Sequence, residues 1–180
     1  MKQFSFLFLI CISLIFFSCE EQADEGFIPY EGPISELHDI DMNFVDSART
    51  IVRMITPTQL TFADDNRKYP EEVKLWFYDK LGNISSEIRG DSAKYARNTN
   101  TYTLMGNVEI YNPQKDETIK TPEFVWYPDF SEIRSDSSVS VRTPTQTIFG
   151  KGFTAKQDFS EYTLKQIVRS VIEVPDLPSN

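Results

Sequence analysis

Beyond residue 50, apolar and polar residues of the chain alternate with a period of two over many short stretches. Residues 73–78 are rich in aromatic and β-branched side chains, residues 102–111 continue the pattern, and residues 137–142 alternate cleanly. Alternation of this kind is typical of strands with one buried face. The ten prolines fall mostly at the ends of such stretches, where a missing N–H does least harm to a sheet. The pattern predicts a chain that is nearly all β.

The predicted strands repeat at intervals of about thirty residues. Ile88, Ile119 and Ile148 serve as origins and lie 31 and 29 residues apart. Positions five, fourteen and twenty residues further on are apolar in each unit: Ala93, Phe124 and Phe153; Tyr102, Ile133 and Tyr162; Val108, Val139 and Val168. Ile110 and Val141 extend the match in two units, whereas the third has Ser170. Each unit predicts a strand pair that buries its apolar face only by stacking on the next. The repeat favours an elongated stack, or a jellyroll opened lengthwise, with unpaired backbone at both end strands.

The N-terminus has the features of a secretion signal. Lys2 precedes an apolar run from Phe4 to Phe17, and the small residue Ser18 stands before Cys19. A run of about 14 residues is shorter than the roughly 20 that span a bilayer as a helix. Because Cys19 would be the only cysteine left after cleavage, it has no internal disulfide partner, and lipidation is the expected role. The alternatives are a non-lipidated signal peptide and a short membrane helix.

Three segments are expected: a lipoprotein signal peptide over residues 1–18, an acidic flexible tether over 19–36, and one domain over 37–180. The tether follows from the acidic run after Cys19 and from Pro29, Gly32 and Pro33. Lys and Arg number 18 against 27 Asp and Glu, a net charge of −9, which becomes −10 once Lys2 is removed. This balance argues against nucleic acid as the main partner.

No catalytic constellation is found. His38, the only histidine, stands beside Asp39 and Asp41 without a further ligand, so a solvated acidic approach is the better interpretation than a metal site. Asp129, Glu132 and Asp136 lie in a polar turn and strand end, where surface solvation is a better interpretation than a glycosidase pair. The chain is therefore expected to be no enzyme and to need no metal or cofactor.

The remaining candidate site is the apolar interior of the sheet. Alternation and repeat position select eleven residues as a candidate lipid-lining interior: Leu75, Phe77, Ile88, Leu104, Val108, Ile110, Phe124, Trp126, Val139, Val141 and Phe153. A plain, filled β core accounts for the same residues. An error of one residue in register would invert a strand.

Several segments, in order, resemble the LptC family, the periplasmic component of the lipopolysaccharide export system. The resemblance covers roughly residues 47–174 and rests on residues 69–70, 73–86, 106–110, 119–126, 133–136, 148–153 and 158–164. It implies an all-β fold, an open, twisted β-jellyroll shared with LptA and OstA-like proteins. It also implies lipopolysaccharide transport, with acyl chains inside the jellyroll and sugars outside.

The resemblance further implies which partners the chain meets. Lipopolysaccharide would come from an inner-membrane LptBFG-type transporter and pass to an LptA-type bridge protein, both docking by strand addition. The outgoing edge would be the strand near residues 162–174, with Tyr162, Leu164, Val168 and Ile172, and the incoming edge the segment 44–55. Many members keep an uncleaved N-terminal helix, whereas this chain is expected to be cleaved and acylated. The anchor is placed at the periplasmic face of the inner membrane, with the outer membrane as the alternative location. The competing function is a lipid-anchored structural or adaptor protein with a filled core.

Overall fold

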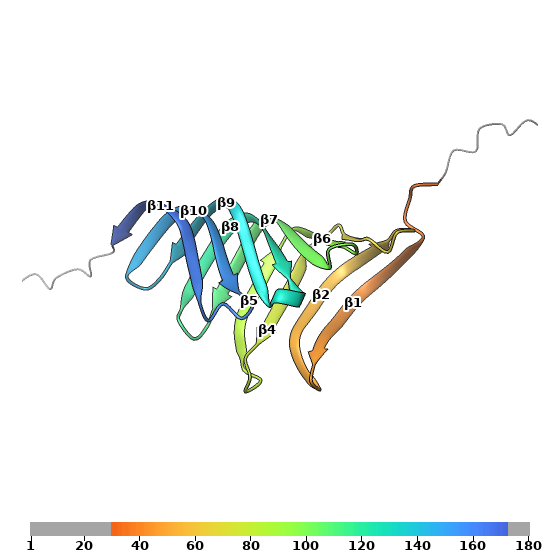
Figure 1. The fold of residues 1–180 in the computed structure, drawn as a ribbon, viewed down its shortest axis with the longest axis horizontal. Coiled ribbons are helices and arrows are strands. Elements are labelled where there is room, and N and C mark those ends of the chain that lie inside the picture. The colour runs from red at the N-terminus through yellow and green to blue at the C-terminus, as the bar shows by residue number, and fades with distance from the viewer. Residues whose placement is uncertain (1–29, 173–180) are drawn as a thin grey trace, which may run out of the picture. The chain divides into compact units, whose positions relative to one another are not determined.

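The computed structural model describes residues 30–172, drawn in colour in Figure 1. The chain divides into two units, Met1–Tyr30 and Glu31–Asn180, and every described strand lies in the second. The strands are β1 (Ser35–Asp46), β2 (Arg49–Thr61), β3 (Arg67–Tyr69), β4 (Val73–Tyr78), β5 (Ile84–Gly90), β6 (Ser92–Ala96), β7 (Thr101–Asn112), β8 (Glu117–Tyr127), β9 (Glu132–Arg142), β10 (Gln146–Lys156) and β11 (Tyr162–Ile172). One 3-10 turn, η2 (Pro128–Phe130), lies between β8 and β9. The prediction of an all-β chain is confirmed.

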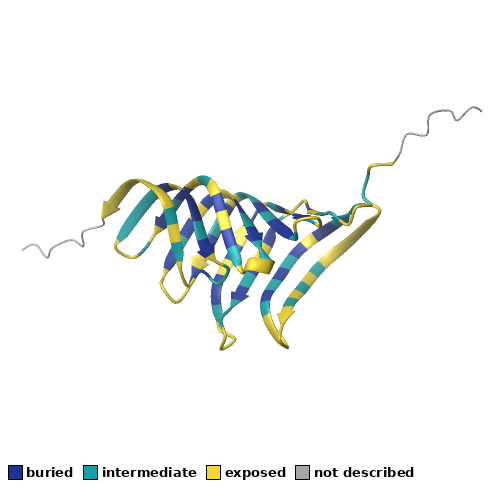
Figure 2. Cartoon of the chain, in the orientation of Figure 1, coloured by how far each residue is buried: buried dark blue, intermediate teal, exposed yellow. Residues whose placement is uncertain are grey.

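Burial follows the two-residue period that the sequence shows. In β4, Val73, Leu75 and Phe77 are buried, while Lys74 between them is exposed. Figure 2 shows the same striping of buried and exposed positions along most strands. Because successive side chains of a strand point to opposite faces, one face of the sheet forms the core and the other meets solvent.

All eleven described strands belong to one antiparallel sheet, in the order β11-β10-β9-β8-β7-β5-β4-β2-β3-β6, with β1 on β2 and a second contact between β6 and β7. The sheet has two halves. In the β6 half, each of six segments pairs with the next: 92–96, 101–105, 123–127, 132–135, 153–156 and 162–164. In the β5 half, six other segments pair in the same consecutive way: 87–89, 108–112, 117–121, 138–142, 146–151 and 166–172. The long strands β7 to β11 therefore run through both halves, and the sheet folds over on itself as an open β-jellyroll.

Each long strand bends where it passes from one half to the other. In β8, Pro122 and Glu123 are both exposed, so the buried positions change from Ile119 and Thr121 to Phe124 and Trp126. The pairing of β8 with both neighbours is interrupted at this point. An extra residue that bends a strand in this way is a β-bulge.

The bend explains why apolar residues five positions apart in the repeat are buried on the same face. Two residues at an odd spacing point to opposite faces of a regular strand. Ile119 and Phe124 are nevertheless both buried, because the extra residue of the bend lies between them. Ile148 and Phe153 of β10 are separated in the same way, with Gly152 between them at a φ of +69°.

In β7 the bend is formed by Gly106 and Asn107, which adopt φ angles of +77° and +43°. This left-handed conformation is readily adopted by glycine and tolerated by asparagine. A Cβ on Gly106 would lie 2.6 Å from Oδ2 of Asp91, at the junction of β5 and β6. Asn107 Nδ2 donates to the same carboxylate oxygen at 2.7 Å. The bends of neighbouring strands are thus fastened to each other.

The predicted strand pairs are confirmed: β5 and β6 with β7, β8 with β9, and β10 with β11 form the three repeating units. Their equivalent positions align across the sheet, in the order Ile88, Ile110, Ile119, Val141, Ile148 and Ser170. The third unit departs at Ser170 because the second half of β11 is exposed, being the last strand of the sheet.

We expect Gly106→Ala to lower the free energy of unfolding by about 2–4 kcal/mol, through about 1 kcal/mol of left-handed strain and the rest from crowding against Asp91. Urea denaturation monitored by tryptophan fluorescence measures the change in the free energy of unfolding. Gly82→Ala is the matched control, because Gly82 has a φ of +85° but nothing within 4 Å of its Cβ position; it should cost only about 1 kcal/mol. Equal losses would contradict the role given to the bend.

Candidate lipid-binding interior

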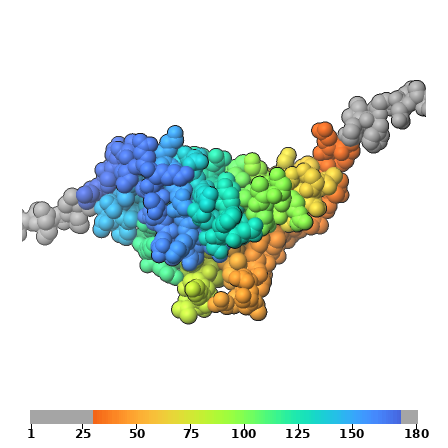
Figure 3. Space-filling model, viewed as in Figure 1, coloured from red at the N-terminus to blue at the C-terminus, as the bar shows by residue number. Residues whose placement is uncertain are grey.

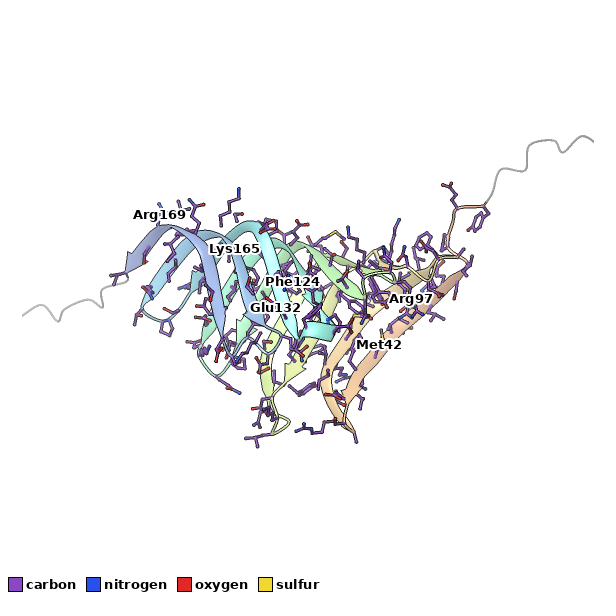
Figure 4. All side chains as sticks on the ribbon, in the orientation of Figure 1. Met42, Arg97, Phe124, Glu132, Lys165 and Arg169 are labelled. Carbon is purple, nitrogen blue, oxygen red and sulfur yellow. The ribbon has the colours of Figure 1, made fainter. Side chains whose placement is uncertain are left out.

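Two rows of side chains face each other between the halves of the sheet. The row on the β5 half consists of Met42, Met54, Leu75, Ile88, Ile110, Ile119, Val141 and Ile148 and ends at Ser170. The row on the β6 half consists of Tyr95, Tyr102, Trp126, Ile133, Ala155 and Tyr162. Each row crosses strand after strand, so the interior between them extends along the whole folded sheet. Met42 of β1 and Phe124 of β8 are labelled in Figure 4.

All eleven residues selected from the sequence are buried, each with at most 3% of its surface exposed. They lie in one hydrophobic cluster that joins both halves. Sequence reasoning missed other members, among them Val52, Met54, Tyr69, Tyr95 and Phe159. Tyr102, Ile119 and Ile133 belong to the cluster as well, and their repeat positions could have identified them. The grouping of the selected residues is thereby established, while their contact with lipid stays a prediction.

Aromatic rings hold the two halves together near β1. The Trp126 ring lies 5.3 Å from that of Phe77, 5.2 Å from that of Phe44 and 5.2 Å from that of Tyr102. The first two contacts are edge-to-face, a favourable geometry that adds about 0.5–1.5 kcal/mol each beyond burial. Trp126 lies in the β6 half. Phe77 lies in β4, which pairs with β5 and so belongs to the β5 half. The contact between the two rings therefore joins the halves. Desolvation by this packing raises the pKa of the Tyr102 hydroxyl.

The interior is closed to solvent in this structure. Phe124, Ile133, Val141 and Phe153 have no exposed surface. A hollow of about 960 Å³ is lined by outward-facing residues such as Arg89, Glu109 and Lys120, and also by Val108 and Val139 of the candidate interior. Because protein interiors are close-packed, a lipid chain could enter only if the two halves moved apart. Close packing is the arrangement expected of a filled β core.

The two end strands are β1 and β11. At β11, Tyr162 and Leu164 are half-buried, whereas Val168 and Ile172 are 69% and 71% exposed. At the other end, the open edge is β1 itself; of the expected incoming segment 44–55, only residues up to Asp46 lie on it, because β2 is paired on both sides. For residues 49–55 that expectation was wrong, because β1 begins as early as Ser35 and covers β2 along its whole length. Figure 3 shows β1 and β2 in orange and β11 in blue, at different ends of this unit.

The groups considered for catalysis are each bonded to a different surface partner. Asp129 accepts from Asn100 Nδ2 at 2.7 Å, and Glu132 pairs with Arg134 at 2.6 Å. Asp136 pairs with Lys165, and both Glu132 and Lys165 are labelled in Figure 4. The Arg134 and Lys165 cations lower the pKa of Glu132 and Asp136, the opposite of what a general acid requires.

His38 pairs with Glu36 at 3.5 Å. Within residues 30–172, no group of three or more His, Cys, Asp or Glu side chains is placed to hold a metal ion. Within the same residues, no helix is long and apolar enough to span a membrane. Cys19, with the signal peptide and most of the tether, lies outside the described residues.

A model of the family described as "Lipopolysaccharide-assembly, LptC-related" matches residues 44–173. The match begins near the end of β1 and extends to the end of β11. It therefore includes both apolar rows apart from Met42. No curated protein matches the chain.

We expect Trp126→Ala to lower the free energy of unfolding by about 3–5 kcal/mol, because it leaves a cavity between the two halves. Trp76 of β4 is the matched control: it is half-buried on the outer face, where the Arg53 guanidinium lies 5.9 Å from its ring. Trp76→Ala should cost about 1 kcal/mol. Urea denaturation followed by circular dichroism compares the two, and a larger loss for Trp76→Ala would contradict the central role of Trp126.

Proposed function

Since this chain belongs to the LptC-related family of lipopolysaccharide-assembly proteins, we propose that it receives lipopolysaccharide from an LptBFG-type inner-membrane transporter and passes it to an LptA-type bridge protein. Membership of the family places the chain in lipopolysaccharide transport in the periplasm. The observation that best supports the specific transfer is the pair of facing apolar rows, which cross from strand to strand toward both ends of the sheet.

The acyl chains of the lipid would lie between these rows. The eleven candidate residues supply apolar surface on both sides, and burying such surface is favourable by about 25 cal/mol per Å². Because the interior is closed, loading requires the halves to separate. The lipid must then replace contacts such as the one between Phe77 and Trp126 with contacts of its own. The exchange is close to balanced, which suits a protein that must also release its cargo.

The end strands would dock the partners. An exposed edge presents unpaired N–H and C=O groups, which another strand can pair with irrespective of its sequence. β11 would receive the LptA-type protein, and β1 would face the transporter. Ile167 and Val171 are exposed beside Val168 and Ile172, and they would add apolar contact to the main-chain pairing.

Cys19 would carry the membrane anchor, and the residues after it would form the tether. The expected end of the tether at residue 36 overlaps the start of β1, where Ser35 and Glu36 pair with Thr61 and Leu60. A single acyl chain binds a membrane only marginally, whereas two or more hold it stably, as a diacylglyceryl cysteine would. The proposed location is the periplasmic face of the inner membrane, where the transporter lies; lipoproteins are also sent to the outer membrane.

The competing function is a lipid-anchored structural or adaptor protein. The closed interior favours it, because a core of this packing needs no ligand to account for its burial. The two functions differ in whether lipid ever contacts the interior side chains.

A photo-crosslinking residue in place of Phe124 should capture lipopolysaccharide in cells, because Phe124 is fully buried between the halves. The same residue in place of Glu109 or Lys74, which lie on the outer face, should capture little. Immunoblotting for lipopolysaccharide-bound protein measures the difference. Equal capture at both sets, or none at either, would contradict transport through the interior and favour the adaptor.

Val168→Asp should weaken binding of an LptA-type protein by about tenfold or more, because it sets a charge in the proposed apolar contact. Val45→Asp is the matched control at the other end strand, since Val45 is 60% exposed on β1. Surface plasmon resonance with the purified LptA-type protein gives both affinities. A greater loss for Val45→Asp would assign that partner to β1 instead.

A further inference from the structure

Away from the bends, the two halves of the sheet end in turns, and two of these turns are joined across the interior. The first follows β7 and spans residues 113–116 in the β5 half. The second follows β10 and spans residues 157–161 in the β6 half. We refer to the second turn, residues 157–161, as the lid. It is anchored in its own half, where Gln157 N donates to Ser131 O at 2.9 Å and Trp126 Nε1 donates to Gln157 Oε1 at 3.2 Å.

Side chains of the first turn and its flanks hold the lid in place. Lys115 Nζ donates to the backbone oxygens of Ser160 at 2.7 Å and Phe159 at 3.4 Å. Asn112 Nδ2 also donates to Phe159 O, at 3.4 Å. Tyr162, the residue that follows the lid, donates to Glu117 Oε2 at 2.8 Å. Burial and this carboxylate raise the pKa of the Tyr162 hydroxyl, so it remains a donor at any physiological pH.

The lid places one aromatic residue inside the core. Its sequence is Gln-Asp-Phe-Ser-Glu, yet Phe159 is only 1% exposed and belongs to the hydrophobic cluster. Its ring centroid lies 6.4 Å from that of Phe153, one of the candidate lipid-lining residues. Phe130, in the neighbouring turn of the same half, is by contrast 73% exposed.

Phe159 is held there at a cost in backbone energy. Its φ is +51°, a conformation that is uncommon for a bulky side chain and persists only where the surroundings enforce it. Those surroundings are the buried ring and the donors on its carbonyl group. Loss of either would let the backbone relax, so the lid is poised to leave the core.

We propose that Phe159 occupies the place of a lipid acyl chain and that the lid closes the interior until a lipid displaces it. This inference rests on the proposed function, because the displacing ligand is an acylated lipid. When the lid opens, the Phe159 carbonyl returns to water, and Phe153 is left facing an apolar space. An acyl chain fills that space without any strained backbone.

The first test needs no lipid. In the full chain, Lys115→Met and Asn112→Asp each remove a donor to the Phe159 carbonyl; Asn112→Asp keeps the oxygen that accepts from Gln114 N and Lys115 N. Amide hydrogen exchange at the Phe159 N–H group, which donates to Lys156 O at 2.9 Å, should become about tenfold faster in both variants. Phe130→Ala, in the neighbouring turn of the same half, is the matched control and should leave the exchange rate unchanged. Unaltered exchange in both donor variants would overturn the proposal that these contacts hold the lid.

The second test removes the ring itself. Phe159→Ala should increase the fluorescence of the apolar dye 1-anilinonaphthalene-8-sulfonate several-fold and speed capture of lipopolysaccharide by the crosslinker at position 124, whereas Phe130→Ala should do neither. Dye binding that does not rise would overturn the lid, with circular dichroism confirming that the variant is folded. If dye binding rises in Phe159→Ala but neither it nor the wild type captures lipopolysaccharide, the lid is supported as a cover of the core and the proposed function fails.

Discussion

The structure depends on one constraint: a single sheet carries apolar side chains on the same face along its whole length, and that face must leave water. A flat sheet would need a second layer, which this chain does not provide within residues 30–172. Folding the sheet along a line of bends solves the problem, because each half then buries the face of the other. The bends at Gly106, Pro122 and Gly152 are therefore as necessary to the core as the residues in it.

The same solution fixes where the protein is open. A folded sheet is closed along its bends, but it has two end strands and one long side where turns meet. The end strands retain unpaired backbone at β1 and β11, and the turns meet through the contacts of Lys115, Asn112 and Tyr162 with the lid and its flank. Under the proposals above, partners would dock at the end strands and lipid would enter at the side where the turns meet; the two regions adjoin at Tyr162, the first residue of β11.

The sequence predicted the strands beyond residue 50, the repeat and about half of the buried interior, because a two-residue period and a fixed spacing are properties of neighbours along the chain. It did not predict the bends, since the step from Ile119 to Phe124 is apolar at both ends and reveals nothing of the extra residue between them. It also gave no sign of Phe159, whose neighbours are all polar; only the fold shows that this turn reaches the core. Whether the halves close on each other depends on packing between distant segments, as with Phe77 and Trp126, and periodicity carries no information about it.

The line of bends also limits which strands can be added to the sheet. It reaches the outer strand β11 near Lys165, opposite Gly152. A strand that pairs along the whole of β11 must itself bend at that level, or it will match one half and diverge from the other. Backbone pairing places little constraint on sequence. A bent edge strand, however, can pair along its whole length only with a strand that bends at the same position. If partners dock by strand addition as proposed, the fold would select them by their curvature, and a protein that shares the bend would extend the same interior.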